Sequence, residues 1–359
     1  MKVHVSQKWV WMGLAAIFTF ALVSAAGAQP GEFVKGVLQP LADGFPNRAI
    51  TMIVVDDPGS RDGFYARAMQ EALKGISPVP IRVSDEPLAV GGTFDKLVET
   101  RGREGGTDGY YPIVTDVWGA GTDPLTEPIK KELGMDLSDL KMVTITESIT
   151  YFMMQRKNTP WGPTFAGMVK YAKENPGKVR YISKEVGSGN DIACSTILSM
   201  AGILDKVKKI PQGTMQECAS TVAAGMGDIT LTYAVLATPH IQAGRADVIL
   251  STGYSVPPPF DKDPNVVTLE KAGLPKMQFG AILGMSVPKQ VSQAHVDWLF
   301  KLFKAAASTD LHKKRQETNP GLMIYVMDPA EAEQAKNKYY EMAEPIVRQL
   351  GLHIDQKKK

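Results

Sequence analysis

Two polar loops in this chain combine residue types that could hold a small anion. The first contains Pro58-Gly59-Ser60-Arg61-Asp62-Gly63, and the second, within Lys178–Leu198, contains Gly187-Ser188-Gly189-Asn190-Asp191. Each loop follows strand-forming residues and precedes apolar residues at helical spacing. Free N–H groups at a helix start carry partial positive charge and bind anions, and Arg61 could clamp a carboxylate with two hydrogen bonds. Gly-rich turns are also common as plain strand-to-helix connections, so both roles stay open.

The charges around these loops leave the chemistry of a ligand open. Acidic residues outnumber basic ones there, since Arg61 and Lys184 stand against Asp56, Asp57, Asp62, Glu185 and Asp191. If the acids face a ligand, they would suit a cationic group on that ligand or a bridging metal ion. The simpler alternative is that Asp62 and Asp191 cap their helices, because Asp is a favoured N-cap residue, while the other acids lie on the solvated rim.

Residues that usually carry catalysis form no recognisable constellation. The chain contains no HExxH, P-loop or G-x-S-x-G motif. The histidines beyond the N-terminal segment show no metal-ligand spacing; they are His240, His295, His312 and His353. Ser188 has no evident base, and a lone loop serine is more often a hydrogen-bond donor than a nucleophile. We therefore expect a protein that is not an enzyme and that needs neither a cofactor nor a metal.

The first 28 residues read as a secretory signal peptide. Lys2 and Lys8 precede the apolar run Val10–Val23, and Ala26-Gly27-Ala28 matches a small-residue cleavage site. An uncleaved anchor is the alternative, but the apolar run is short for a membrane span. We expect cleavage after Ala28 and a periplasmic location.

The composition argues against nucleic acid as a partner. The 359 residues include 40 Lys and Arg against 38 Asp and Glu, and removal of Lys2 and Lys8 leaves 38 of each sign. A chain without net charge has no general attraction for nucleic acid or for an anionic membrane surface. Cys194 and Cys218 are the only cysteines. Export permits a disulfide between them, but two buried thiols on separate helices are the favoured expectation, because a bridge needs closely spaced Cα atoms.

Strand-like and helix-like segments alternate along the chain. Apolar, β-rich runs occur at Ala49–Val55, Ile81–Val83, Tyr110–Val114, Leu140–Gln155, Val207–Ile210, Asp228–Tyr233, Ala246–Ser251 and Phe279–Val287. Helix starts are indicated by Thr164, by Thr214, and by Asp328 followed by Pro329. The alternation predicts an α/β fold with mostly parallel sheets.

Several short motifs, in their order along the chain, resemble the receptor proteins of tripartite tricarboxylate transporters, the Bug-type periplasmic binding proteins. The motifs are Pro46-Asn47-Arg48-Ala49-Ile50-Thr51, Pro58-Gly59 with Ala66-Arg67, Asp108-Gly109-Tyr110, Thr159-Pro160-Trp161, the run Tyr171–Lys178, Gly187-Ser188, and Glu270-Lys271-Ala272-Gly273-Leu274-Pro275. Each motif is short, and their shared order carries the resemblance, which covers the chain from Phe45 onward.

The resemblance implies an α/β, two-lobed periplasmic binding protein (type II-like) with the ligand cleft between the lobes. Lobe 1 is expected at residues 47–148 and 284–355, and lobe 2 at 149–283, after the signal peptide (1–28) and a leader (29–46). Leu140–Gln155 and Phe279–Val287 are the expected crossings. The expected ligand-binding residues are Gly59, Ser60, Arg61, Asp62, Gly63, Glu185, Gly187, Ser188, Gly189, Asn190, Asp191, Thr232 and Tyr233.

The implied function is that of a monomeric receptor that captures a small carboxylate-bearing organic acid and delivers it to the membrane subunits of a tripartite tricarboxylate-type transporter. A receptor of the same fold that presents its ligand to a sensor kinase is the alternative. The sequence departs from the family pattern at Ser60, Gly63, Ile182, Glu185, Asp191 and Thr232. These departures leave room for a ligand other than the simple di- and tricarboxylates.

Overall fold

The computed structural model describes residues 29–56, 60–87 and 92–356. The signal peptide expected at residues 1–28, together with its cleavage after Ala28, lies outside this range. Within the described ranges, strands and helices alternate along most of the chain, as the apolar periodicity predicts. None of the helices in these ranges is both long enough and apolar enough to span a membrane.

The secondary-structure elements are numbered in chain order. The strands are β1 (Phe33–Val34), β2 (Val37–Leu38), β3 (Ile50–Val54), β4 (Ile81–Asp85), β5 (Ile113–Asp116), β6 (Leu140–Arg156), β7 (Val179–Ser183), β8 (Val207–Pro211), β9 (Ile229–Tyr233), β10 (Ala246–Ser251), β11 (Val267–Thr268), β12 (Gly280–Pro288) and β13 (Leu322–Met327). The α-helices are α1 (Arg61–Ala72), α2 (Gly92–Gly102), α3 (Val117–Thr126), α4 (Ile129–Leu133), α5 (Phe165–Glu174), α6 (Gly189–Met200), α7 (Met215–Ala223), α8 (Ala234–Gln242), α9 (Gln293–Ala307), α10 (Asp310–Thr318) and α11 (Pro329–Gln349). Short 3-10 helices lie at Leu137–Asp139, Leu204–Lys206 and Ile354–Gln356.

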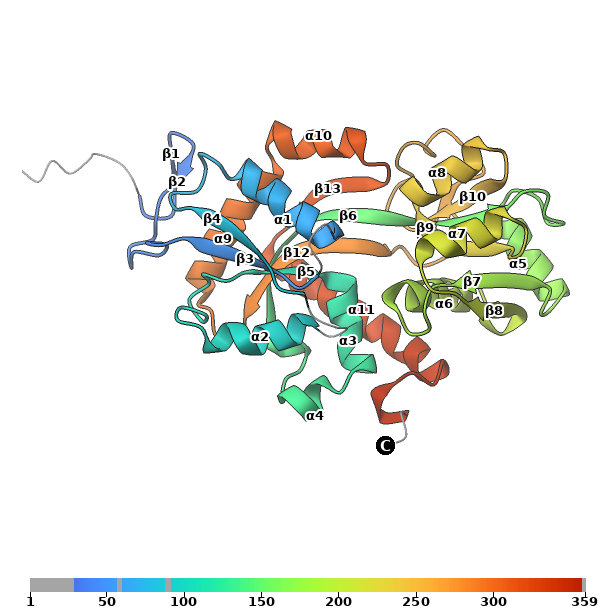
Figure 1. Cartoon of the computed structure of the whole chain (residues 1–359), viewed down its shortest axis with the longest axis horizontal. Helices are drawn as coiled ribbons and strands as arrows, with labels where there is room; N and C mark the ends of the chain where they lie inside the picture. Colours follow the sequence, from blue (N-terminus) through green and yellow to red (C-terminus); the bar gives the residue numbers. More distant parts are fainter. Residues whose placement is uncertain (1–28, 57–59, 88–91, 357–359) are drawn as a thin grey trace, which may run out of the picture.

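These elements form two halves that lie side by side (Figure 1). In the first, which we call the β3 half, the strand order is β4-β3-β5-β12-β6, and β13 also pairs with β6. In the second, the β7 half, the order is β6-β9-β7-β8, and β10 pairs with β6. The strand β6 therefore belongs to both halves and connects them directly.

The sheet is mixed, so the prediction of mostly parallel strands was wrong. β3 is parallel to β4 and β5, and β7 is parallel to β8 and β9. β6, however, is antiparallel to β9, β10, β12 and β13. The prediction counted strand–helix–strand units, whose crossover connections make strands parallel. The long strands β6 and β12 instead run beside each other in opposite directions. Their presence does confirm the two long strands predicted at Leu140–Gln155 and Phe279–Val287.

β6 carries an irregularity near its middle, where it pairs with both β12 and β13. Leu283 of β12 is opposite Glu147, but the next residue, Gly284, is opposite Ile145. The register with β13 shifts at the same point, because Ile324 is opposite Glu147 whereas Met327 is opposite Ile145. Thr146 thus has no partner on either side, which is the pattern of a β-bulge, and bulges bend a strand and increase its twist.

Buried polar side chains occupy this bulge and tie two helices to it. Thr146 Oγ1 lies 2.6 Å from the hydroxyl of Tyr65 on α1. Glu147, which is fully buried, accepts hydrogen bonds from Arg315 of α10 at 2.5 and 3.3 Å. The ring of His312, also on α10, lies 3.2 Å from the same carboxylate. A charge buried inside a sheet is costly unless it is paired, so α10 stabilises the bend in β6.

The segment 29–46 is packed into the β3 half and does not stand apart as a leader. Leu38 and Phe45 are buried among residues of β3, α1 and α9. The indole N–H of Trp298 on α9 donates to the backbone oxygen of Gln39 at 2.8 Å. A boundary at residue 46 was expected because the segment has no periodicity. Short, irregular segments nevertheless bury apolar side chains when a neighbouring helix covers them.

The two cysteines are buried, unbonded thiols, which confirms the favoured expectation. Cys194 lies on α6 in the core that includes Tyr181, whereas Cys218 lies on α7 in a separate cluster that includes Phe152. Burial raises the pKa of Cys194 to about 12, so this thiol is a structural, unreactive group.

The buried pair at the β6 bulge yields a stability prediction. Glu147→Gln leaves the Arg315 guanidinium and His312 without their carboxylate, so we expect the free energy of unfolding to fall by about 3 kcal/mol. Glu71→Gln is the matched control, because its pair with Lys74 is solvent-exposed and is expected to change stability by less than about 0.5 kcal/mol. Urea unfolding of both variants measures this; equal losses would contradict a special role for Glu147.

Candidate ligand-binding site

Serine side chains cap the two helices that follow the predicted loops. Ser60 Oγ accepts the N–H of Gly63 at 3.1 Å, and Ser188 Oγ accepts the N–H of Asp191 at 3.3 Å. The alternative that Asp62 and Asp191 cap these helices was therefore wrong. An N-cap needs an extended backbone one position before the helix, which Ser60 and Ser188 have. The two aspartates already lie inside the first turn.

The carboxylate of Asp191 faces inward and holds the second loop together. It accepts hydrogen bonds from the Ser183 hydroxyl at 2.7 Å and from the Gly187 N–H at 3.0 Å. Lys209 of β8 forms an ion pair with it, and Asp191 is fully buried. Asp191 thus shapes the loop from within, and a direct contact of Asp191 with a ligand stays a prediction.

The guanidinium of Arg61 joins three elements at the boundary between the halves. Its Nε donates to Asp62 at 2.9 Å, one terminal nitrogen donates to Asp116 at 2.9 Å, and the other donates to the Tyr233 hydroxyl at 2.9 Å. Asp116 lies at the end of β5, in the β3 half, and Tyr233 lies at the end of β9, in the β7 half. One side chain from the first loop therefore spans both halves.

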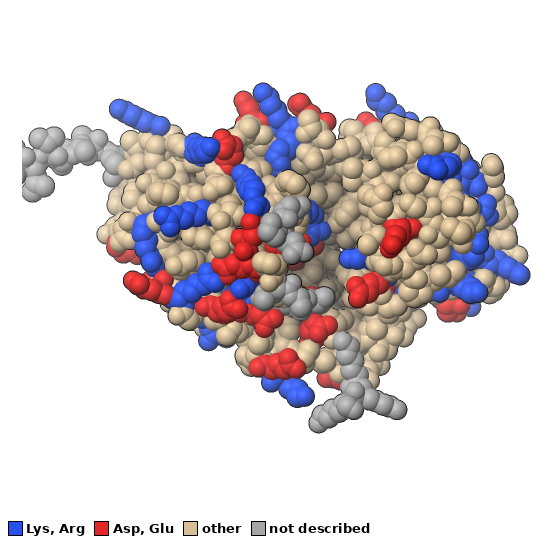
Figure 2. Space-filling model, in the orientation of Figure 1, with Lys and Arg blue, Asp and Glu red and all other residues tan. Residues whose placement is uncertain are grey.

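A second contact connects the start of α3 with the start of α6. The indole N–H of Trp118 donates to the backbone oxygen of Gly189 at 2.8 Å. Asp116 Oδ1 in turn accepts the N–H groups of Trp118 at 3.2 Å and of Ile282 at 3.3 Å. Through Asp116, the Arg61 and Gly189 loops belong to one hydrogen-bonded network. The space-filling view shows the surface hollowed between the two halves (Figure 2).

Two tyrosines complete the network on the side of the β7 half. The rings of Tyr151, on β6, and Tyr233 are 4.9 Å apart, and their hydroxyls are 3.5 Å apart. Tyr151 is nearly fully buried. The network, consisting of Arg61, Asp62, Asp116, Trp118, Tyr151, Gly189 and Tyr233, therefore combines a cation, phenol hydroxyls and helix N-termini, which are groups that bind carboxylates.

The network carries more negative than positive charge. Burial opposes the charge of the guanidinium, but Asp62, Tyr233 and Asp116 outweigh this and hold the pKa of Arg61 well above its ordinary value. Burial raises the pKa of Asp116, although Arg61 works against that shift. Burial, Asp116 and Glu127 together raise the pKa of Asp123, on α3, to about 7. Arg61 is thus shared by two carboxylates, and a third lies further along α3.

The remaining predicted site residues have varied positions. Gly59 lies outside the described residues. Gly63 is in the first turn of α1, Glu185 is exposed, and Gly187 adopts φ +82° at the turn of the second loop. Asn190 is buried and its amide donates to the backbone oxygen of Leu231 at 3.1 Å. Thr232 is fully buried. The structure thus brings Arg61, Asp62, Gly189 and Tyr233 into one network and leaves the ligand contacts of the others as predictions.

Sequence reasoning missed Asp116, Trp118 and Tyr151. The strand expected at Tyr110–Val114 is in fact β5, Ile113–Asp116, so its polar end was placed too early. A signal was available, because Asp116 follows a β-branched run and precedes a helix. In α/β folds the carboxyl ends of strands are where ligands bind.

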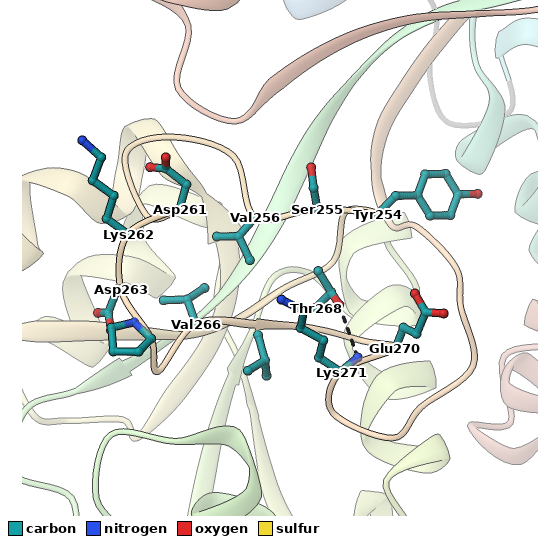
Figure 3. A pocket seen from close by; sticks show the side chains of 12 residues that line it. Tyr254, Ser255, Val256, Asp261, Lys262, Asp263, Val266, Thr268, Glu270 and Lys271 are labelled. Atoms are coloured by element: carbon teal, nitrogen blue, oxygen red, sulfur yellow. Dashed lines mark hydrogen bonds between the residues drawn. The ribbon is translucent and has the colours of Figure 1, made fainter.

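A pocket of about 750 Å³ lies elsewhere, in the segment between residues 254 and 271 (Figure 3). Its charged lining residues are of both signs, namely Asp261, Lys262, Asp263, Glu270 and Lys271. In the close-up view Tyr254 points away from Asp261 and Lys262, and the drawn hydrogen bond joins the backbone N–H of Lys271 to Thr268. None of the network residues lines this pocket, so we place the candidate site at Arg61.

Within the ranges that the structure describes, no three His, Cys, Asp or Glu side chains are grouped closely enough to hold a metal ion.

Comparison with known proteins finds a family that matches well over half of the chain. Residues 95–352 match the model of the tripartite tricarboxylate transporter family receptor.

Solved structures agree with this match in fold. A TctC solute-binding protein from Polaromonas, solved without ligand, superimposes with a TM-score of 0.71 at 17% identity, covering 85% of this chain and 99% of that one. MatC from Rhodopseudomonas palustris with bound malate superimposes with a TM-score of 0.59 at 19% identity, covering 84% of this chain and 100% of MatC. A protein of R. palustris with bound adipate superimposes with a TM-score of 0.60 at 18% identity, covering 86% of this chain and 98% of that one. The predicted α/β fold of the two-lobed periplasmic binding protein type is therefore confirmed.

The contact between Trp118 and Gly189 can be tested with a matched pair of glycines. A Cβ at Gly189 would lie 3.0 Å from Trp118 Nε1 and 3.1 Å from its Cδ1. We therefore expect Gly189→Ala to lower the free energy of unfolding by about 1–3 kcal/mol through overpacking. A Cβ at Gly119, inside α3, would meet only the Cβ of Asp116, at 3.9 Å, so Gly119→Ala should stabilise by about 0.5–1 kcal/mol. Denaturant unfolding tests both; a stabilising Gly189→Ala would contradict the close contact.

The raised pKa of Asp123 predicts a pH-dependent stability. An aspartate ordinarily titrates near pH 4, at about 3.9, whereas Asp123 in the folded chain has a pKa of about 7. Between these values the folded state holds a proton that the unfolded state has lost, so the free energy of unfolding falls as pH rises through this window. Asp123→Asn removes this contribution. In thermal unfolding, the difference in stability between Asp123→Asn and the wild type should shift in favour of the variant as the pH rises from 5 to 8. If the two proteins show parallel curves of melting temperature against pH, the assignment to Asp123 is wrong.

Proposed function

The chain belongs to the tripartite tricarboxylate transporter receptor family, and from that premise we propose that it captures a small carboxylate-bearing organic acid between its two halves. The receptors of this family bind solutes. On this proposal the acid is then delivered to the membrane subunits of a tripartite tricarboxylate-type transporter, and the receptor acts in the periplasm as a monomer after cleavage at Ala28.

The observation that carries the proposal is the Arg61 network. It places a guanidinium, two phenol hydroxyls and the starts of α1, α3 and α6 at the boundary between the halves. A guanidinium and helix N–H groups are donors that carboxylates accept with charge-assisted hydrogen bonds. The malate and adipate bound to the two R. palustris proteins are both dicarboxylates, and this supports the class of ligand.

We further propose that the halves move relative to each other when the acid binds. The lobes would comprise residues 47–148 with 284–355, and 149–283, connected by β6 and β12. This division is supported by the pairing of β6 with β12 and β13 along its first part and with β9 and β10 along its last part. Contacts to both lobes favour the closed arrangement, because a ligand shifts an equilibrium by its differential affinity for the two states.

Ligand screening tests the proposal directly. We expect at least one small carboxylate to raise the melting temperature of the mature protein. At a concentration of 100 times its Kd, the acid should add about 2.7 kcal/mol to the free energy of unfolding. Calorimetry with that acid should show Arg61→Ala to weaken binding by about 1.5–3 kcal/mol, the range for a hydrogen bond to a charged group.

Arg348→Ala serves as the control for this measurement, since Arg348 pairs only with Glu344 and Asp355 on the surface among the described residues. Its affinity for the same acid should be unchanged. If no carboxylate stabilises the protein, the proposed function is wrong; if Arg61→Ala binds normally, Arg61 lies outside the site.

A further inference from the structure

We propose that Leu352, in the turn that follows α11, is a positioning residue for ligand binding. Its side chain holds the second loop at Gly187, so that the start of α6 stays within reach of Trp118. Through α11, the C-terminal part of the chain thereby forms a third connection between the halves, in addition to β6 and β12. This inference rests on the proposed function and adds to it a residue that lies outside the Arg61 network.

The helix α11 packs against both halves, since it lies beside α3 of the β3 half and α6 of the β7 half (Figure 1). Its contact with α3 is close, because a Cβ at Gly121 would lie 3.2 Å from both the backbone oxygen of Lys336 and the Cβ of Tyr339. The Tyr339 ring also meets the Trp118 ring edge-on, with 5.4 Å between their centroids. The part of α11 next to α3 therefore belongs to the β3 half.

The buried ammonium of Lys336 anchors α11 on the same side. It donates to the backbone oxygens of Leu137 at 2.9 Å and of Leu140, the first residue of β6, at 2.5 Å. It also forms an ion pair with Glu333 at 2.6 Å. A buried charge that loses its partners is costly. A movement of the halves would therefore carry this part of α11 along with the start of β6.

The end of α11 turns the chain toward the β7 half. Gly351 adopts φ +69°, and its N–H donates to the backbone oxygen of Arg348 at 3.1 Å, while the N–H of Leu352 donates to that of Val347 at 3.0 Å. This pair of hydrogen bonds is a Schellman motif, in which a glycine in the left-handed region ends a helix. The motif fixes the direction in which Leu352 leaves α11.

Leu352 lies against the second loop at Gly187. A Cβ at Gly187 would be 3.5 Å from Cδ1 and 3.9 Å from Cδ2 of Leu352. Apart from the neighbours of Gly187 along the chain, no other residue that the structure describes comes within 4 Å of that position. Leu352 also packs against the core cluster that contains Ile192 of α6. One apolar side chain thus connects the anchored α11 to the loop and to the helix after it.

This contact acts on a ligand through the backbone of the loop. Gly187 donates its N–H to Asp191 at 3.0 Å, Ser188 caps α6, and Gly189 accepts the hydrogen bond from Trp118. These groups face a ligand correctly only when the loop is in place. If the loop spends only part of its time there, the affinity for the ligand falls in proportion to that part.

The test uses three variants. Leu352→Ala removes the methyl groups that face Gly187, whereas Leu352→Met keeps an apolar side chain of similar volume. Leu41→Ala is the matched control, because Leu41 is also partly buried but packs in the core cluster of β3 and α9. Calorimetry uses malate, succinate or adipate, whichever binds the wild type most tightly. We expect Leu352→Ala to raise the Kd about fivefold, and the other two variants to change it by less than about twofold.

Hydrogen exchange without ligand measures the position of the loop itself. In Leu352→Ala the amides of residues 184–189 should exchange about fivefold faster than in the wild type, because local opening of the loop becomes easier. In Leu352→Met and Leu41→Ala their exchange should match that of the wild type. A general loss of stability would speed exchange in this loop for Leu41→Ala as well, so the comparison isolates the contact with Gly187.

The outcomes separate this inference from the proposed function. If Leu352→Ala binds the acid as tightly as Leu41→Ala does, the inference is overturned while the proposed function stands. Unchanged exchange at residues 184–189 in Leu352→Ala overturns the positioning role even when the affinity falls. If the wild type binds none of the three acids, the proposed function is contradicted, and the role of Leu352 in binding with it.

Discussion

The side chain of Arg61 is the point on which the candidate site depends. A guanidinium that is partly withdrawn from water needs carboxylates and hydroxyls around it. Arg61, whose side chain is 29% exposed, takes these partners from α1, from the ends of two strands and from both halves of the molecule. The charge of Arg61 therefore holds the ends of β5 and β9 in fixed relation to the start of α1. Trp118 extends this arrangement to the start of α6 by a single hydrogen bond to Gly189. Without the guanidinium, Asp62 and Asp116 would be two unbalanced charges at the same boundary.

The strand β6 supplies the mechanical connection between the halves. It pairs with partners in both, and it bends at Thr146, where the register to β12 and to β13 shifts. The polar groups at this bend are satisfied by Tyr65 of α1 and by Arg315 of α10. Since α1 also carries Arg61, four residues before Tyr65, the hydrogen bond between Tyr65 and Thr146 links the bend to the site across about one helix turn. A movement of the halves about β6 would therefore act on the position of Arg61 directly.

The candidate site contains charges of both signs. Helix N-termini and a guanidinium attract a carboxylate, but Asp116 and Asp123 add negative charge along α3. In a solvated cleft these charges would be screened, whereas in a closed cleft each must be balanced by a neighbour. On the proposed function, the arrangement of these charges contributes to the choice of ligand together with the size of the ligand.

The sequence by itself determined many of the elements and where several of them begin, although β5 was placed too early. The strands β6 and β12, the caps Thr164, Thr214 and Asp328, and the two loops that precede α1 and α6 all follow from residue types within a few positions of one another. Apolar periodicity and capping are local properties, so they can be read without a partner. The family resemblance was also available, because it depends on the order of short motifs.

Only the tertiary structure decided which polar residues meet. Arg61 contacts Tyr233 across 172 positions of the chain and Asp116 across 55. The local sequence marks Asp116 only as the end of a strand, and it does not show that Trp118 or Tyr151 lies in the same network. The Asp191 carboxylate faces inward, where it forms an ion pair with Lys209 of the strand β8. The mixed sheet results from β6 and β12, which run antiparallel to each other between the halves. Each of these results from packing between distant segments, which local propensity does not encode.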